Sequence, residues 1–236
     1  MMTQSAIARR VLTIAAHPDD EILGCGGAMA AHTARGDEVG ILILGEGLTS
    51  RAASRADADR SGLPDLKQDA RAAAAVIGVS DVTLLDFPDN RFDSVDLLDV
   101  IKAVEAIRAR INPDVVYVHH WGDLNVDHRV TFDAVMTAFR PLPGEAPVSI
   151  YAFEVPSSTA WAGPSAAAAF VPTHFVEIGP LLDRKIEAME SYLSERRVWP
   201  HPRSPEALRA YARYRGTQVG LDAAEAFVAV RTVVRW

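Results

Sequence analysis

Short apolar runs alternate with longer helical stretches through the first half of the chain. Four runs of strand type, rich in Val, Ile and Leu, lie at residues 11–16, 39–44, 82–85 and 114–118. Stretches that end at a glycine or before a proline predict helices at residues 22–34, 66–77 and 94–111. This alternation is typical of βαβ units, and strands that are apolar throughout are buried on both faces. We therefore expect an α/β fold with a mostly parallel sheet flanked by helices.

Elements of both kinds continue beyond residue 140. This segment is rich in proline at its start and then predicts strands at residues 149–154 and 174–178, helices at 181–192 and 205–215, and a last strand near 227–234. No linker long or polar enough to separate two domains interrupts it. We predict a single domain over residues 1–236, in which a core of residues 1–140 carries a C-terminal α/β extension, residues 141–236, that contributes to the substrate pocket.

The composition restricts the classes of partner. With 24 Lys and Arg against 31 Asp and Glu, the formal net charge of −7 argues against a nucleic acid bound through its phosphates, which requires a basic face. The single cysteine, Cys25, excludes an internal disulfide framework and a four-cysteine zinc module. No apolar run reaches the roughly 18 residues of a membrane span, and Arg9-Arg10 is followed by too few apolar residues for a signal peptide. We expect a cytoplasmic protein without membrane insertion.

Polar residues directly follow two of the predicted strands. Residues 17–21, HPDDE, come after the first strand, and residues 119–128, HHWGDLNVDH, come after the fourth. Ligands of open parallel sheets bind outside the carboxyl ends of the strands. Although 111 residues separate His17 from His128, we expect both clusters at the same edge of the sheet. Their convergence indicates a functional site.

Three of these residues form a suitable set of metal ligands. His17, Asp20 and His128 offer two imidazoles and one carboxylate, which leaves an open position for water, as in catalytic zinc sites. Zinc would lower the pKa of that water toward about 7 and polarise a carbonyl oxygen. Asp19, next to one ligand, could take a proton from the water as the general base. We therefore expect one zinc ion per chain and a metal-dependent amide hydrolysis.

The first cluster also has a plainer interpretation, a polar turn in which one of the aspartates is the N-cap of a helix.

The glycines of residues 24–27 lack the GxGxxG spacing of a dinucleotide loop, so we expect them to let a helix approach the sheet closely. Cys25 is then expected to pack as a small hydrophobe. His32 and His174 are expected to be surface residues and not ligands.

Two motifs stand out at the predicted site. AHPDDE occupies residues 16–21, and Asp127-His128 stands at a helix start. In both motifs the chain resembles the PIG-L/LmbE-like N-deacetylases, the family of GlcNAc-phosphatidylinositol de-N-acetylase and of deacetylases in the mycothiol and bacillithiol pathways. The resemblance implies a Rossmann-like fold, zinc held by the three ligands named above, and Asp19 as the general base.

The resemblance also implies the reaction. Family members hydrolyse acetamido groups, so the expected substrate is a small N-acetylated amino sugar or one of its conjugates. A water molecule on the metal attacks the carbonyl carbon, and acetate and a free amine are released. A homo-oligomer is expected as well.

One position departs from part of that family. Thiol-pathway members often carry a histidine three residues before the last zinc ligand, where it assists the developing oxyanion, whereas this chain has Asn125. An asparagine amide can donate a hydrogen bond to an oxyanion but cannot deliver a proton as an imidazolium can. Either Asn125 suffices beside the metal, or His119, His120 or His201 supplies the proton. The departure weakens the case for a thiol-pathway substrate.

Further residues are candidates for contact with the substrate. Three of them, in the loop after the third predicted strand, could bind sugar hydroxyls or form an ordinary turn: Asp89, Asn90 and Arg91. Trp121 could stack on a pyranose face or be a buried structural residue. Residues 196–204 hold the compact basic stretch of the chain, in which His201 and Arg203 could grip a phosphate; the alternative is a solvated loop.

Two other function classes fit the same residues. Two histidines and one carboxylate also form the facial triad of non-haem iron(II) oxygenases, although those enzymes generally use a β jelly roll and not βαβ units. A non-catalytic sugar-binding module would not need Asp19, because binding alone requires no base. Within the favoured class, the substrate could be a free sugar, a sugar nucleotide, a glycolipid, a thiol-linked pseudodisaccharide or a glycosylated natural product.

Overall fold

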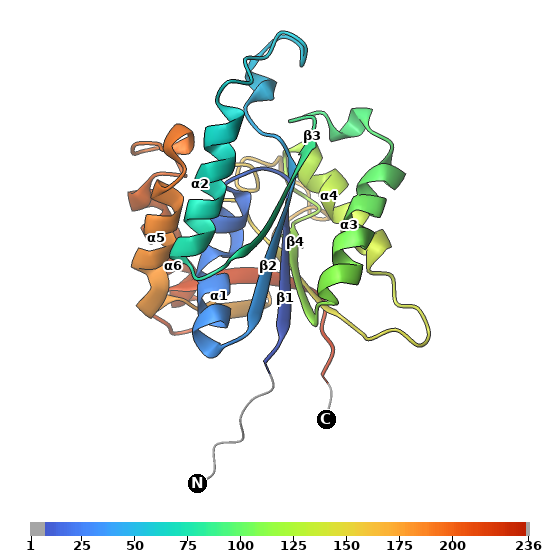
Figure 1. The fold of residues 1–236 in the computed structure, drawn as a ribbon. Helices are drawn as coiled ribbons and strands as arrows, with labels where there is room; N and C mark the ends of the chain where they lie inside the picture. The colour runs from blue at the N-terminus through green and yellow to red at the C-terminus, as the bar shows by residue number, and fades with distance from the viewer. Residues whose placement is uncertain (1–7, 235–236) are drawn as a thin grey trace.

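A computed structural model of the protein describes residues 8–234. Its centre is a seven-stranded sheet in the order β3-β2-β1-β4-β5-β7-β6 (Figure 1). The strands are β1 (Arg10–Ala15), β2 (Glu38–Gly45), β3 (Asp81–Phe87), β4 (Val115–His119), β5 (Ser149–Phe153), β6 (His174–Glu177) and β7 (Ala224–Arg231). Strands β1 to β5 run parallel, and β7 is antiparallel to both of its neighbours. The expected α/β fold with a mostly parallel sheet is confirmed.

Helices cover both faces of the sheet (Figure 1). One face carries α1 (Asp20–Arg35), α2 (Leu63–Val76), α5 (Leu182–Glu190) and α6 (Pro205–Thr217), and the other carries α3 (Leu97–Ile111) and α4 (Val126–Ala138). Short 3-10 helices are η1 (Thr49–Arg51), η2 (Phe92–Ser94), η3 (Gly179–Leu181) and η4 (Leu193–Glu195). Within residues 8–234, no helix is both long enough and apolar enough to cross a membrane.

Strand β1 shows why the predicted strands are apolar throughout. Its alternate side chains point to opposite faces of the sheet. Val11 and Ala15 belong to the apolar cluster under α1 and α5, whereas Leu12 and Ile14 belong to the cluster under α3 and α4. Both clusters are buried, so the residues of the strand from Val11 to Ala15 all face a core.

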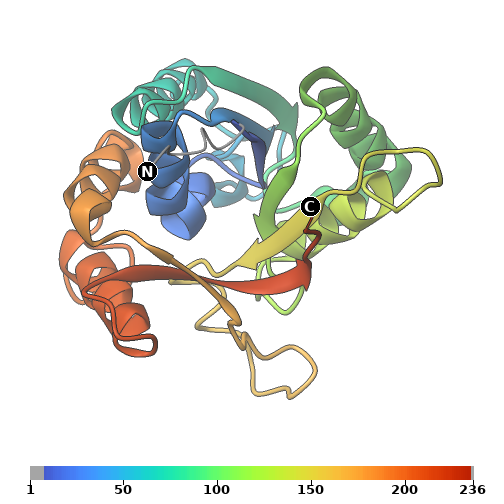
Figure 2. The same cartoon turned by 90° about the horizontal axis from the view of Figure 1, so that it is seen from below.

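The residues after 140 extend the same sheet. β5 pairs with β4, and β7 and β6 continue the order beyond β5 (Figure 2). α5 and α6 lie on the face that α1 and α2 also cover. The expected C-terminal extension is therefore packed on the core through a continuous sheet and a shared helical layer.

Small residues let α1 lie directly against the sheet and its neighbours. A Cβ atom on Gly24 would lie 2.2 Å from Cδ2 of Phe153, and one on Gly27 would lie 2.6 Å from Cγ2 of Ile178. Cys25 is fully buried between these positions. The expectation that these glycines serve close packing is confirmed, as is the packing of Cys25.

Helix α1 is kinked at Cys25, whose backbone is not helical (φ −147°). The kink leaves backbone groups without partners inside the helix. The carboxylate of Glu225 on β7 accepts the N–H groups of Gly27 (2.9 Å) and Ala28 (2.7 Å). The buried ammonium of Lys185 on α5 donates to the same carboxylate at 2.6 Å. The C-terminal extension thus fixes the helix whose first turn carries the predicted site.

Four expectations are wrong in detail. The helix expected at residues 94–111 is two elements, η2 and α3, because Val95 between them is extended. The last strand ends at Arg231 and not at residue 234. His32 is not a surface residue, because its ring bonds to Asp37 at 2.6 Å and to the hydroxyl of Tyr117 at 3.0 Å. His174 is half-buried and stacks on Tyr151, with 4.3 Å between ring centroids.

Candidate metal centre

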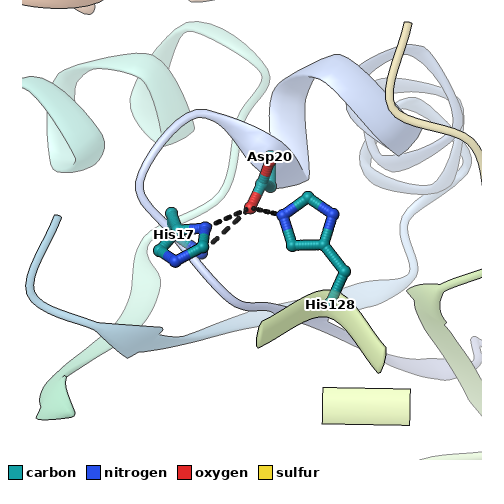
Figure 3. A group of neighbouring side chains, drawn as sticks. All are labelled: His17, Asp20 and His128. Carbon is teal, nitrogen blue, oxygen red and sulfur yellow. Dashed lines mark hydrogen bonds and ion pairs between the residues drawn. The ribbon is translucent and has the colours of Figure 1, made fainter. Parts of the chain in front are cut away.

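The two polar clusters meet at the carboxyl ends of β1 and β4. Asp20 begins α1, and His128 lies in the first turn of α4. One carboxylate oxygen of Asp20, Oδ2, lies 3.2 Å from Nδ1 of His17 and 3.1 Å from Nε2 of His128 (Figure 3). Asp20 and His128 are buried, and the side chain of His17 is 12% exposed. The structure therefore brings the three predicted ligands together.

The outer nitrogen of each histidine has a carboxylate partner. Nε2 of His17 lies 2.9 Å from Oδ2 of Asp127, and Nδ1 of His128 lies 3.1 Å from Oδ1 of Asp123. Histidines that bind metals commonly donate the other ring N–H to a carboxylate, which fixes the tautomer and the ring orientation. Both rings are therefore held with the inner nitrogen directed at the carboxylate of Asp20.

A cation fits this arrangement on chemical grounds. Nε2 of His128 is buried and makes no well-aligned hydrogen bond, and its nearest polar neighbour is the carboxylate oxygen of Asp20 at 3.1 Å, an arrangement that a cation between them would satisfy. It faces the carboxylate of Asp20 and the inner nitrogen of His17, a set of nitrogen and oxygen donors suited to zinc. A second group that could hold a cation, His17 with Asp89 and Asp127, uses the outer nitrogen of His17. If the first set binds the cation, Asp127 and Asp123 remain available to orient the rings of His17 and His128.

Asp19 is held in an unusual backbone conformation beside the ligands. Its φ of 107° is rare for any residue other than glycine, and its side chain does not cap α1. The plainer N-cap interpretation of the motif therefore fails for this residue. The backbone N–H of Asp19 donates to Oε2 of Glu21 at 3.1 Å, and the hydroxyl of Tyr192 donates to the other oxygen of Glu21. These buried bonds hold the strained turn in place.

The carboxylate of Asp19 is paired with an arginine from the C-terminal extension. Nη1 of Arg203 donates to Oδ2 of Asp19 at 2.6 Å, and Nε of Arg203 donates to the hydroxyl of Ser157 at 3.0 Å. Burial raises the pKa of Asp19 to about 7, although the guanidinium of Arg203 acts to lower it. A carboxylate with a pKa near neutrality can both accept and return a proton.

A cavity of about 160 Å³ opens above these residues. Its lining includes all residues of the turn from His17 to Asp20, and Asp89, Asn90 and Asn125 of the predicted substrate contacts. The extension contributes two further residues, Glu195 and Arg203. The remaining lining residues are Gly47, Leu48, Ser50, Arg51 and Leu66.

Asn125 has two fixed hydrogen bonds at the edge of this cavity. It is the N-cap of α4, where its Oδ1 accepts the backbone N–H of Asp127 at 2.9 Å. Its Nδ2 donates to Oδ1 of Asn90 at 2.9 Å. The capping bond orients the amide, so one N–H of Nδ2 is left for another acceptor.

The three candidate proton donors lie outside the cavity lining. His119 is fully buried, its Nε2 accepts the backbone N–H of Ala16 at 2.9 Å, and burial lowers its pKa well below the usual value. His120 is also fully buried, and burial lowers its pKa to about 4. The ring of His201 accepts the backbone N–H of Arg203 at 3.1 Å, and burial lowers its pKa as well. His119 stacks on the ring of His128, with 3.8 Å between centroids, but it lies behind the ligands, and none of the three imidazoles is part of the cavity lining.

Two other predicted contacts also lie away from the cavity. Trp121 packs between His120 and Phe132, and its indole N–H donates to the carbonyl of Ala167 at 3.1 Å. Arg91 reaches the carbonyl of Ala53 at 3.4 Å on the exposed side of the loop. Trp121 therefore matches the alternative of a structural tryptophan, and Arg91 matches the alternative of an ordinary turn.

The basic stretch divides into two parts. Arg196 is exposed and bonds to the carbonyl of Glu190, as in a solvated loop, whereas Arg197 is half-buried and also bonds to the carboxylate of Glu195 at 3.1 Å. Arg203 is directed inward to Asp19. The side chain expected to grip a phosphate is therefore already paired with a carboxylate.

Sequence reasoning did not identify four further residues of the site. Asp123 and Asp127 lie in a segment rich in polar residues, and the spacing does not reveal which carboxylate orients which histidine. Arg51 and Glu195 carry no local motif, because they meet only through the path of two distant loops. Of these four residues, Asp127 alone has a recognisable signal, its position next to His128.

Comparisons with known proteins bear on this site. The family model described as PIG-L, GlcNAc-PI de-N-acetylase, matches residues 12–139, which contain all three candidate ligands and Asp19. The chain is 31% identical to the uncharacterized deacetylase YaiS of Escherichia coli over 63% of this chain and 75% of the relative.

Two further proteins are similar over more of the chain. A probable N-acetyl-alpha-D-glucosaminyl L-malate deacetylase 2 of Bacillus cereus is 26% identical over 79% of this chain and 84% of the relative. The crystal structure of the conserved protein TT1542 from Thermus thermophilus superposes with a TM-score of 0.73 at 27% identity, covering 97% of each chain. The chain therefore belongs to the PIG-L family and is a deacetylase, a hydrolase of amide bonds.

Proposed function

We propose that the protein uses zinc to hydrolyse the N-acetyl group of an amino sugar or an amino-sugar conjugate, releasing acetate and a free amine. The observation that carries the proposal is that one donor atom each of His17, Asp20 and His128 lie within 4.8 Å of one another, beside the carboxylate of Asp19. The ligands would be His17, Asp20 and His128. A bound zinc ion lowers the pKa of a water ligand and polarises the carbonyl oxygen of the acetamido group.

Asp19 would act as the general base in this reaction. Its raised pKa of about 7 suits it to accept a proton from water near neutral pH. The same carboxyl group can then return the proton to the leaving amine, because the imidazoles of His119, His120 and His201 lie outside the cavity lining. Arg203 keeps Asp19 oriented and favours its ionised form.

Asn125 would assist at the carbonyl oxygen. Its free amide N–H can donate to the negative charge that develops on that oxygen, in keeping with the position that a histidine occupies in thiol-pathway members. Asp89 and Asn90 would bind sugar hydroxyls at the cavity edge. Residues 141–236 belong to the same functional unit in this proposal, because Glu195 and Arg203 line the cavity.

The proposal is tested by acetate release from a panel of N-acetylated compounds. The panel holds N-acetylglucosamine, its methyl glycoside, N,N'-diacetylchitobiose, UDP-N-acetylglucosamine and N-acetylglucosaminyl malate. Zinc-loaded protein is expected to release one acetate per amine formed from at least one of them. Failure to release acetate from any member, by protein shown to hold one zinc ion per chain, would overturn the proposal.

The iron oxygenase and the binding module make different predictions. The oxygenase would purify with iron alone and consume oxygen. The binding module would hold a sugar equally well after Asp19→Asn and would release no acetate before or after the change. The parallel sheet favours the hydrolase, because the iron enzymes generally use a β jelly roll.

A further inference from the structure

Glu195 lies between two arginines at the cavity. Nη2 of Arg51 bonds to Oε1 of Glu195 at 2.5 Å, and Nη2 of Arg197 bonds to Oε2 at 3.1 Å. Glu195 is 8% exposed, whereas the side chain of Arg51 is 56% exposed. Glu195 and Arg51 both line the cavity, and they come from loops 144 residues apart. One buried carboxylate therefore neutralises two guanidinium groups that would otherwise attract an anion.

The other cation of the cavity lining is neutralised in the same way. Arg203 is paired with Asp19 at 2.6 Å, so each arginine of the lining contacts a carboxylate. Asp89 adds a negative charge to the lining and accepts the backbone N–H of Ser50 at 2.9 Å. A phosphate or carboxylate at the cavity opening would lose water and meet no arginine of the lining that lacks a carboxylate partner, which is unfavourable.

We propose that Glu195 is a specificity-determining residue that makes the site select uncharged N-acetyl sugars over sugars carrying a phosphate or carboxylate near the cavity opening. The inference rests on the proposed deacetylation. It concerns the charge of the substrate and not the chemistry of the amide. Without the carboxylate of Glu195, Arg51 and Arg197 would form a binding site for anions.

The test compares two substrates of the same sugar. Acetate release is measured for methyl N-acetylglucosaminide and for N-acetylglucosamine 6-phosphate. We expect the natural protein to favour the neutral compound by about tenfold in kcat/KM, because like charges across a binding site suppress wrong partners. Glu195→Gln should raise kcat/KM for the phosphate, relative to kcat/KM for the neutral compound, by about fivefold or more, because two guanidinium groups lose their carboxylate partner.

Glu190→Gln is the matched control. Glu190 lies 3.6 Å from Arg196, is 41% exposed, and does not line the cavity, so the substitution removes the same charge from a nearby solvated pair. The ratio should not change in this variant. An equal shift in both variants, or a natural protein that prefers the phosphate, would overturn the inference.

Product binding separates the inference from the proposed function. Calorimetric titration with glucosamine and glucosamine 6-phosphate measures charge selection without any turnover, and Glu195→Gln should strengthen binding of the phosphate alone. If no compound is hydrolysed while this discrimination is found, the proposed function fails and the charge selection stands. If an active enzyme shows no discrimination, the charge selection fails and the proposed function stands.

Ionic strength supplies a test that needs no variant, which matters if Glu195→Gln does not fold. Salt screens repulsion between exposed charges, with a Debye length of about 10 Å at 0.1 M. The preference of the natural protein for the neutral sugar should therefore weaken as salt rises from about 0.02 to about 0.5 M. A preference that grows with salt would show that the opening attracts anions and would contradict the inference.

Discussion

Two regions of the site use charged residues for different purposes. We call the candidate ligands with Asp19, Asp123 and Asp127 the floor of the cavity, and the side of the cavity formed by Glu195 and Arg203 its wall. On the floor, Asp123 and Asp127 bond to the outer nitrogens of two histidines and so orient donor atoms toward a common point. On the wall supplied by the C-terminal extension, Arg203 and Glu195 form ion pairs that set the charge and acidity of the cavity. The floor comes from the segment that the family model matches, and the wall comes from beyond it.

This difference separates the reaction from its selectivity. Changes in the floor should remove metal or the proton-accepting group and abolish hydrolysis, whereas changes in the wall should alter the pH range or the preferred substrate. Four substitutions test this division, and they are given in order from the largest expected effect to the smallest.

Asp19→Asn should have the largest effect. The amide cannot accept a proton from water, so kcat should fall by about a thousandfold, within the range usual for loss of a general base. Zinc content, measured by atomic absorption, and the far-UV circular dichroism spectrum should be unchanged. A rate within tenfold of the natural protein would remove Asp19 from the role of base.

Asp123→Asn should weaken metal binding by about 10 to 100-fold, the usual cost of losing a carboxylate that orients a histidine ligand. Burial acts to raise the pKa of Asp123, but hydrogen bonds from His128 and Thr159 outweigh it and lower the pKa to about 2, so the group is ionised at all working pH values. Competition with a chromogenic chelator measures the affinity.

Asp133→Asn, an exposed change on the same helix as His128, is the control for Asp123→Asn. Its zinc affinity should equal that of the natural protein. Equal affinities in both variants would mean that Asp123 does not orient His128.

Arg203→Gln should move the acidic limb of the kcat/KM profile to higher pH. The guanidinium favours the ionised form of Asp19, so its loss raises the pKa of that carboxyl, and a base is inactive while protonated. We expect a loss of about tenfold at pH 6 that narrows toward pH 9, where Asp19 is ionised in both proteins. A loss of the same size at every pH would indicate a purely structural role.

Arg91→Gln should have the smallest effect. Arg91 lies outside the cavity lining, so KM for the best substrate should change by less than about twofold, as is usual for exposed sites. Asn90→Ala, one residue away and inside the lining, should raise KM by more. Comparison of the two KM values shows whether the cavity lining marks the substrate contacts correctly.

The sequence predicted the floor far better than the wall. The ligand set and Asp19 follow from two motifs after parallel strands, because the carboxyl ends of such strands meet at one edge. Arg203 was expected to grip a phosphate, but the fold of the C-terminal loop turns it to Asp19. Glu195 carries no signal, since its partner Arg51 is 144 residues away.

The directions of side chains within a motif could not be predicted either. His119 ends β4 and His120 follows it, close to the expected place, yet both rings are enclosed by neighbouring aromatic side chains and lie outside the cavity. A strand end tells which residues are near an edge, while packing decides where their side chains point. Asp123 and Asp127 illustrate the same limit, because their partners are set by the geometry of a loop and a helix start.

The central claim is tested most directly by adding zinc back to chelated protein while acetate release is recorded on the best substrate of the panel. We predict no release without metal and a linear rise that levels off at one zinc ion per chain. Acetate release by protein shown to contain no metal would contradict the claim. So would the absence of release from the whole panel at full zinc occupancy.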